Sequence, residues 1–158
     1  MGGAGGAGRG RGGKIAYGMC SYGDDIGVST EFKVLTNVHN SIVDPKNVDL
    51  QSMVNGKAWS KLDGLVDGVV YAFPADANSA RYVYRTVTSA VATKLDLSLG
   101  SDDTLTVWVN GEKIHDNKAA RGVAADQDKI SVQLVAGENQ LLFRICNGGG
   151  GHGFYFRG

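Results

Sequence analysis

The sequence predicts an all-β protein, an antiparallel β-sandwich of the jelly-roll type. Apolar and polar residues alternate along most of the second half of the chain, which is typical of half-buried strands. Turn motifs separate the alternating runs at regular, short spacing. The length of 158 residues suits a single domain with one sizeable core. We therefore expect about eight to ten strands arranged in two packed sheets.

The alternation identifies the strands of the second half one by one. Within each run the apolar members share a face, and these sets are Leu95, Leu97 and Leu99; Leu105, Val107 and Val109; Ile130, Val132 and Leu134; Leu141, Phe143 and Ile145; and Phe154 with Phe156. Upstream, residues 81–87 alternate aromatic residues against arginines, and residues 14–20 and 31–38 are weaker strand candidates. Residues 44–68 are expected to form a short helix or a loop that carries Trp59.

The segments between these runs have the composition of turns. The pair Asn110-Gly111 accepts positive φ at both central positions and predicts a two-residue hairpin. Residues 136–139 predict another turn. Asp102 and Asp103 follow a Gly-Ser pair, where short carboxylates accept backbone N–H groups. The four glycines at 148–151 predict a mobile link between the last two strands.

Composition argues against several classes of function. Lys plus Arg and Asp plus Glu both number 16, so the basic excess of a nucleic-acid-binding protein is missing. No apolar run approaches the roughly 20 residues of a membrane span.

The glycine-rich residues 1–13 have no apolar core of a secretory signal, and we expect a flexible arm or linker ahead of one domain over 14–158. Their Gly-x-Gly-x-x-Gly pattern is followed by a strand-like run, which argues against a dinucleotide site.

Trp108 is the least ordinary residue of the predicted hairpin. Alternation places it on the face opposite Leu105, Val107 and Val109. If those three residues face the core, Trp108 points outward beside Thr104 and Thr106. An outward tryptophan needs a cover, which is either a loop of the chain, a partner or a ligand.

From Trp59 to the end, about 100 residues, the chain resembles a known family. The motifs that carry the resemblance are Trp59 with Leu62-Asp63-Gly64, Asp67-Gly68, Tyr82-Val83-Tyr84-Arg85, LGSDDTLTVWVNGEKIH, Arg121-Gly122 with Asp126-Gln127-Asp128, AGENQLLFRICN and GGGGHGFYFR. They are similar to the galactose-binding-like jelly-roll modules of bacterial extracellular enzymes and surface proteins. The resemblance implies a non-catalytic module, extracellular or at the cell surface, that often binds carbohydrate and often holds a structural calcium. His152 departs from the family, where this position is often aromatic, and residues 14–58 resemble no family that we identify.

A sugar site needs a flat aromatic ring and a few planar polar groups. The aromatic candidates, with His152 included, and their polar partners are Trp59, Trp108, His152, Tyr155, Asp102, Asn110, Arg121 and Asn147. Each aromatic is equally open to an interpretation as core or interface packing. For Arg121 the alternative is a surface ion pair with Asp126 or Asp128.

Two further features involve pairs of residues. Calcium takes clustered oxygen ligands, and Asp102 with Asp103 is the candidate pair, beside Asp24-Asp25 and Asp126 with Asp128. None of these pairs has EF-hand spacing, so a site would be assembled from separate loops. Cys20 and Cys146 flank the predicted sandwich and form either a disulfide or two buried free thiols.

Two functional interpretations remain open at this point. The first is a carbohydrate-binding module whose partner is a glycan or polysaccharide. The second is a structural subunit of an extracellular filament, surface layer or multi-domain enzyme, in which the glycine-rich arm packs on a neighbouring copy. We expect no enzyme, because the chain has three glutamates and no Gly-x-Ser-x-Gly motif, although thirteen aspartates keep a small hydrolase as a third, weaker interpretation.

Overall fold

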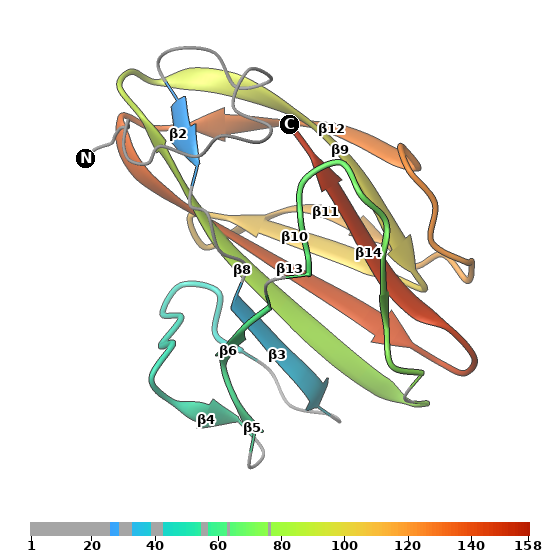
Figure 1. Ribbon diagram of the computed structural model, residues 1–158. Coiled ribbons are helices and arrows are strands. Elements are labelled where there is room, and N and C mark those ends of the chain that lie inside the picture. Colours follow the sequence, from blue (N-terminus) through green and yellow to red (C-terminus); the bar gives the residue numbers. More distant parts are fainter. Residues whose placement is uncertain (1–25, 29–32, 39–42, 55–56, 63, 76) are drawn as a thin grey trace.

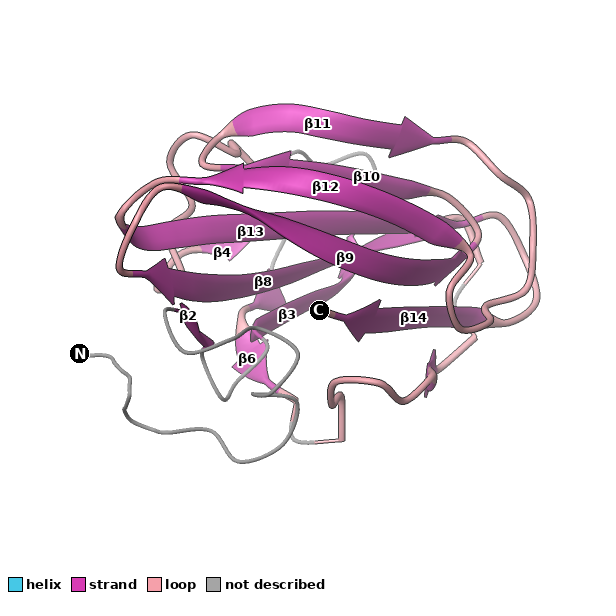
Figure 2. Cartoon of the chain, turned by 90° about the horizontal axis from the view of Figure 1, so that it is seen from above, coloured by secondary structure: helices cyan, strands magenta, loops and turns pink. Residues whose placement is uncertain are grey.

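The computed structural model describes residues 26–28, 33–38, 43–54, 57–62, 64–75 and 77–158. All the regular elements of this part are strands, and they pack as two antiparallel sheets in a sandwich, which confirms the predicted fold class (Figures 1 and 2). No helix of the described part is long and apolar enough to cross a membrane. The predicted arm over 1–13 and the strand expected over 14–20 lie outside the described residues.

The larger sheet has seven strands in the order β11-β10-β13-β8-β3-β6, and β2 also pairs with β8. The bounds of these strands are Ile26–Val28 (β2), Lys33–Val38 (β3), Ser60–Lys61 (β6), Ser79–Ser89 (β8), Leu105–Val109 (β10), Glu112–Asn117 (β11) and Gly137–Asn147 (β13). The longest pairing joins β8 and β13 over eleven residues from each strand.

The smaller sheet has four strands in the order β12-β9-β14-β7. Their bounds are Tyr71–Phe73 (β7), Thr93–Asp102 (β9), Asp128–Leu134 (β12) and His152–Arg157 (β14). A separate small hairpin joins Met53–Val54 (β4) to Lys57–Ala58 (β5). The described residues of 44–68 thus form turns and short strands, and the loop alternative for this segment, not the helix, is confirmed.

The core lies between the sheets and consists of the alternating residues that the sequence identified. Apart from Ile130, which is partly buried, every member of the five predicted apolar sets is at most 5% exposed. Phe143 of the larger sheet meets Phe154 and Phe156 of the smaller one, with ring centroids 5.2 and 5.7 Å apart. These aromatic contacts fix how the two layers face each other.

Strand β8 turns its arginines, and not its tyrosines, toward the interior. Val83 and Val87 belong to the core, so the odd-numbered positions Arg81 and Arg85 face inward with them. The guanidinium of Arg85 lies 2.7 Å from the Asp67 carboxylate, an ion pair that compensates the burial of its charge.

A second apolar cluster covers part of the outer face of the larger sheet. Its buried members are Val43, Tyr82, Tyr84 and Leu142, and the partly buried Val48, Leu50, Trp59 and Trp108 pack against them. The rings of Trp59 and Tyr84 meet edge to face with centroids 6.3 Å apart. The segment from Val43 to Leu50, here called the covering segment, contributes Val43, Val48 and Leu50 to this cluster. A Cβ on Gly111 would lie 2.9 Å from Lys46, so the covering segment reaches the β10–β11 turn. Trp108 points outward as predicted, and a loop of the chain itself covers part of its ring.

Candidate functional site

The outer face of the larger sheet carries three rows of side chains that cross strands β8, β13, β10 and β11. The pairing registers, extended by the two-residue step of a strand, give the rows Ala80, Cys146, Thr104 and Lys118; Tyr82, Arg144, Thr106 and Asp116; and Tyr84, Leu142, Trp108 and Lys113. The covering segment lies over the third row, and the first row lies at the opposite end of the strands.

The first row lies at a hollow of about 500 Å³. Ala80, Cys146 and Thr104 have short side chains, whereas the next row begins with Tyr82 and Arg144. This difference in side-chain length leaves space at the end of the sheet. The lining of the hollow combines apolar and polar groups, and neighbouring loops and strand ends contribute Asn78, Ser79, Asp103, Ala119, Ala120, Asn147 and Gly148.

The middle row is polar and charged. The Arg144 guanidinium forms a hydrogen bond with Tyr82 and lies 5.9 Å from the centroid of the Trp108 ring. The Asp116 carboxylate accepts hydrogen bonds from Lys118 at 3.0 Å and from Thr106 at 3.2 Å. The hydrogen bond from Lys118 is the main reason that the pKa of Asp116 is lowered. The open outer face therefore runs from the hollow, past an arginine, to a partly exposed tryptophan.

Asp103 forms part of the wall of the hollow and holds two loops together. Its carboxylate accepts the backbone N–H of Arg121 at 3.0 Å and that of Gly148 at 3.1 Å, as the turn interpretation predicted. Burial, followed by the neighbouring carboxyl of Asp103, raises the pKa of Asp102. The described residues contain no group of three or more His, Cys, Asp or Glu side chains suited to a metal, so calcium at Asp102 and Asp103 remains a prediction.

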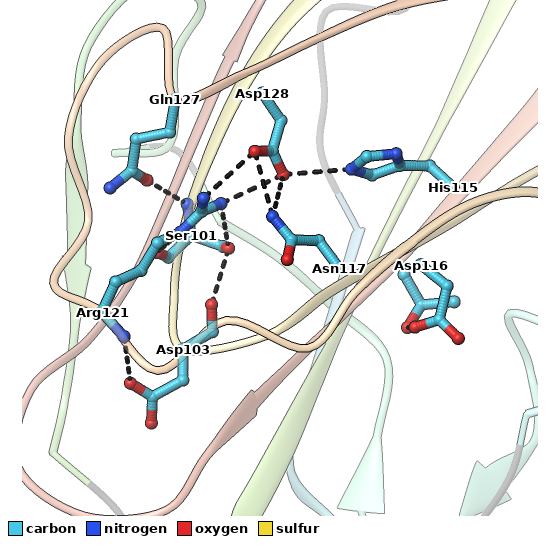
Figure 3. A network of polar contacts seen from close by, with 9 residues as sticks. Ser101, Asp103, His115, Asp116, Asn117, Arg121, Gln127 and Asp128 are labelled. Carbon is cyan, nitrogen blue, oxygen red and sulfur yellow. Dashed lines mark hydrogen bonds and ion pairs between the residues drawn. The ribbon is translucent and has the colours of Figure 1, made fainter.

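Arg121 lies behind the hollow in a polar network between the edges of the two sheets (Figure 3). Its guanidinium donates two hydrogen bonds of 3.1 Å to the Asp128 carboxylate and a further one to the Ser101 hydroxyl. His115 and Asn117 reach the same carboxylate at 3.1 and 3.2 Å. Burial alone would raise the pKa of Asp128, but these hydrogen bonds outweigh it and lower the pKa to about 2. The ion pair with Asp128 is thus confirmed for Arg121.

Two other predicted sugar contacts, His152 and Tyr155, lie away from the hollow. His152 is 2% exposed, its Nε2 lies 3.0 Å from the Ile145 carbonyl oxygen, and its ring packs on Phe73. Tyr155 is 4% exposed, and its hydroxyl accepts a hydrogen bond from Arg157. These two side chains are packed inside the fold and are not presented to a ligand.

The hairpin residue Asn110 has a structural task. Its φ of 50° and the φ of 83° at Gly111 give the predicted two-residue turn. Its side chain donates to Asn139 at 2.8 Å and accepts the N–H of Gln140 at 2.9 Å, which fastens the turn to β13. Cys20 lies outside the described residues, so its disulfide with Cys146 stays a prediction.

Of the predicted sugar contacts, Asn147 thus lines the hollow with its side chain buried and hydrogen-bonded to the Gly150 carbonyl oxygen, and Trp108 lies farther along the same face. Asp103, predicted as a metal ligand, also lines the hollow. Sequence reasoning placed Thr104 beside Trp108 on the outward face, but it missed Lys118 and Arg144 as members of this surface. Their alternation with core residues was visible in the sequence. Their assembly into rows depends on which strands are neighbours and in what register, and one sequence does not supply that information.

Comparison with known proteins gives short sequence matches and distant structural ones. No family model matches the chain. The chain is similar to the dCTP deaminase of Herpetosiphon aurantiacus, with 54% identity over 48 residues, which is 30% of this chain and 26% of that enzyme. It is also similar to the dCTP deaminase of Roseiflexus castenholzii, with 58% identity over 45 residues, 28% of this chain and 24% of that enzyme. The chain therefore spans about a quarter of the length of the curated relatives it matches.

Among solved structures, the chain is similar to the PA14 domain of the antifreeze protein MpAFP, with a TM-score of 0.47 and 9% identity over 85% of this chain and 82% of that one. A β-glucosidase from Kluyveromyces marxianus, solved in complex with glucose, gives a TM-score of 0.48 and 15% identity over 80% of this chain and 16% of that one. At these scores we draw no functional conclusion from the likeness. The narrower expectation of a galactose-binding-like module stays a proposal.

Proposed function

We propose that this chain is a non-catalytic glycan-binding domain, and that the glycan lies along the open outer face of the larger sheet. The observation that carries the proposal is that the hollow at Thr104 and the partly exposed ring of Trp108 lie on the same face of the larger sheet. Trp108 is four positions along the chain from Thr104, or about 13 Å at the rise of a strand.

The chemistry of this surface suits a carbohydrate. Sugars present apolar ring faces, which stack on an aromatic side chain, and hydroxyl groups, which pair with planar polar groups. Trp108 offers the aromatic face. Arg144 and Asp116 offer a donor and an acceptor beside it, and Thr104 offers a hydroxyl group at the hollow.

The test compares Trp108→Ala with Trp59→Ala. Both tryptophans are partly buried in the second cluster, but Trp59 packs on Tyr84 and does not lie beside the hollow. We expect the wild-type chain and Trp59→Ala to bind members of a glycan array, and Trp108→Ala to lose at least about tenfold in affinity, the equivalent of about 1.4 kcal/mol. Circular dichroism confirms that each variant is folded. Unchanged affinity in folded Trp108→Ala, or no binding by wild type, overturns the proposal.

The assembly interpretation is tested on the same variants. If Trp108 is a contact between subunits, light scattering after size exclusion will find an oligomer that Trp108→Ala dissociates. A wild-type chain that is monomeric and binds glycan supports the module. An oligomer that binds no glycan supports the structural subunit.

The partial similarity to dCTP deaminases favours a second candidate, hydrolytic deamination of dCTP. The match covers 26% of the first relative, and the activity belongs to that whole enzyme. The measurement is ammonia release from dCTP, with and without divalent zinc or magnesium. Our proposal predicts no ammonia release above the buffer control. Ammonia release above that control would show that the chain is a deaminase and would overturn the proposal of a non-catalytic domain.

A further inference from the structure

The middle row of the outer face contains a cation, Arg144, that forms no ion pair with a carboxylate of the described residues, although Asp116 acts on it at longer range. Arg144 forms a hydrogen bond with Tyr82 and lies over Trp108, and it takes part in none of the ion pairs found in this part of the chain. Its neighbour Asp116 is already shared by Lys113 and Lys118, at 3.6 and 3.0 Å.

Most of the charge on this face is compensated. Lys113 and Lys118 pair with Asp116, and the carboxylate of Asp103 lines the hollow. Among the described cations of the three rows, Arg144 thus lacks an ion pair of its own. An arginine in this position favours a ligand that carries an anionic group.

The setting of Arg144 also fixes the direction of its guanidinium. Tyr82 is 0% exposed and holds one side of the group, and the Trp108 ring lies against it. A planar guanidinium held in place loses little conformational freedom when it pairs with a carboxylate through two parallel hydrogen bonds. A lysine at this position would offer a single ammonium group and could not form the two parallel hydrogen bonds.

We propose that the glycan bound on this face is acidic, of the uronic-acid class, and that Arg144 pairs with its carboxylate while Trp108 contacts the adjacent sugar ring. This inference rests on the proposed glycan-binding function and narrows its ligand class. The hollow receives uncharged hydroxyl groups of the same glycan.

The test uses an oligogalacturonate and the same oligosaccharide after reduction of its carboxyl groups to alcohols. Calorimetry at low salt should show the acidic form binding about tenfold more tightly, as expected for one charge-assisted hydrogen-bonded pair. Arg144→Gln should abolish that preference and leave the affinity for the reduced form within about twofold. Arg144→Lys should retain part of the preference for the acidic form, because it keeps the charge but loses the two parallel hydrogen bonds. If Arg144→Gln does not fold, a reduced preference in Arg144→Lys supports the role of Arg144, and an unchanged preference overturns it.

Lys129→Gln is the matched control, because it removes one positive charge from an exposed position on the smaller sheet. It should leave the preference intact. Equal binding of the two oligosaccharides by wild type overturns the acidic class but leaves glycan binding standing. An equal loss of preference in Lys129→Gln shows attraction by overall charge and also overturns the role of Arg144. Failure of wild type to bind either oligosaccharide, or any neutral glycan on an array, overturns the proposed function itself.

Discussion

Asp128 shows how one side chain joins the two layers of this sandwich. It begins β12 at the edge of the smaller sheet, and His115 and Asn117 reach it from β11 at the edge of the larger sheet. Arg121 completes the set from the connecting loop. The side chain of Asp128 is only 9% exposed, so the loss of its charge would leave these donors without their acceptor.

We expect Asp128→Asn to lower the free energy of unfolding by about 2 kcal/mol at pH 7. The pKa of this carboxyl falls from an ordinary 3.8 to about 2 on folding, so its contribution is complete above about pH 4 and is lost as the pH falls toward 2. Urea unfolding of wild type and variant between pH 7 and 2 measures the difference, which should shrink through that window. A difference that stays constant with pH would contradict the charge-based explanation.

The ion pair between Arg121 and Asp128 could be predicted from the sequence, whereas the contacts of His115 and Asn117 with Asp128 could not. The loop position of Arg121, a few residues before Asp126 and Asp128, suggested an ion pair with one of them. His115 and Asn117 were not predicted, because they meet Asp128 only when the edges of two different sheets come together. Contacts within one loop can be read from spacing, whereas contacts between layers require the fold.

At the scale of the elements, the loop over residues 118–127 packs its backbone directly on a strand of the smaller sheet. It crosses the smaller sheet at Gly100, where a Cβ would overlap the carbonyl oxygen of Ala124 and lie 3.0 Å from Gln127. The Gln127 side chain accepts the N–H of Ser101 and donates to the carbonyl of Gly122, which holds the loop against β9. Glycine is needed at position 100 because a backbone oxygen occupies the space of a side chain.

Gly100→Ala should therefore destabilise the protein by about 1–3 kcal/mol, the usual cost of overpacking, because the loop must lift from the sheet. Gly122→Ala is the control, since a Cβ there meets nothing within 4 Å. It should change the stability by less than about 0.5 kcal/mol. Thermal melting and urea unfolding of the two variants give the comparison, and equal stability in both would show that the loop is loosely held.

Strand β8 shows where alternation alone is insufficient to predict orientation. Residues 81–87 contain apolar residues on one face and tyrosines on the other, and both faces are buried. The pattern therefore identified a strand but not its inner side. Val83 and Val87 pack in the main core, and the tyrosines pack under the covering segment, so Arg81 and Arg85 enter the interior. The ion pair of Arg85 with Asp67 makes this orientation tolerable.

On the scale of the whole molecule, the protein has two apolar clusters of unequal weight on the two faces of one sheet. Among the described residues, the main core, which joins the two sheets, contains seventeen buried residues, whereas the outer cluster contains four. Leu142 and Phe143 are chain neighbours on opposite faces of β13, and they are 2% and 0% exposed. Substituting Phe143 and Leu142 in turn therefore distinguishes the contribution of the main core to stability from that of the outer cluster.

Phe143→Ala should cost about 3–5 kcal/mol and lower the melting temperature of the whole domain, because its ring packs against two aromatic rings of the other sheet. Leu142→Ala should act mainly on the cover, because its neighbours are Tyr84 and the segment from Val43 to Leu50. Hydrogen exchange followed by mass spectrometry should then show faster exchange in residues 43–54, with β9 and β14 still protected. If Leu142→Ala instead accelerates exchange in both sheets equally, the cover and the sandwich unfold as one unit, and the face that carries Trp108 is as rigid as the core.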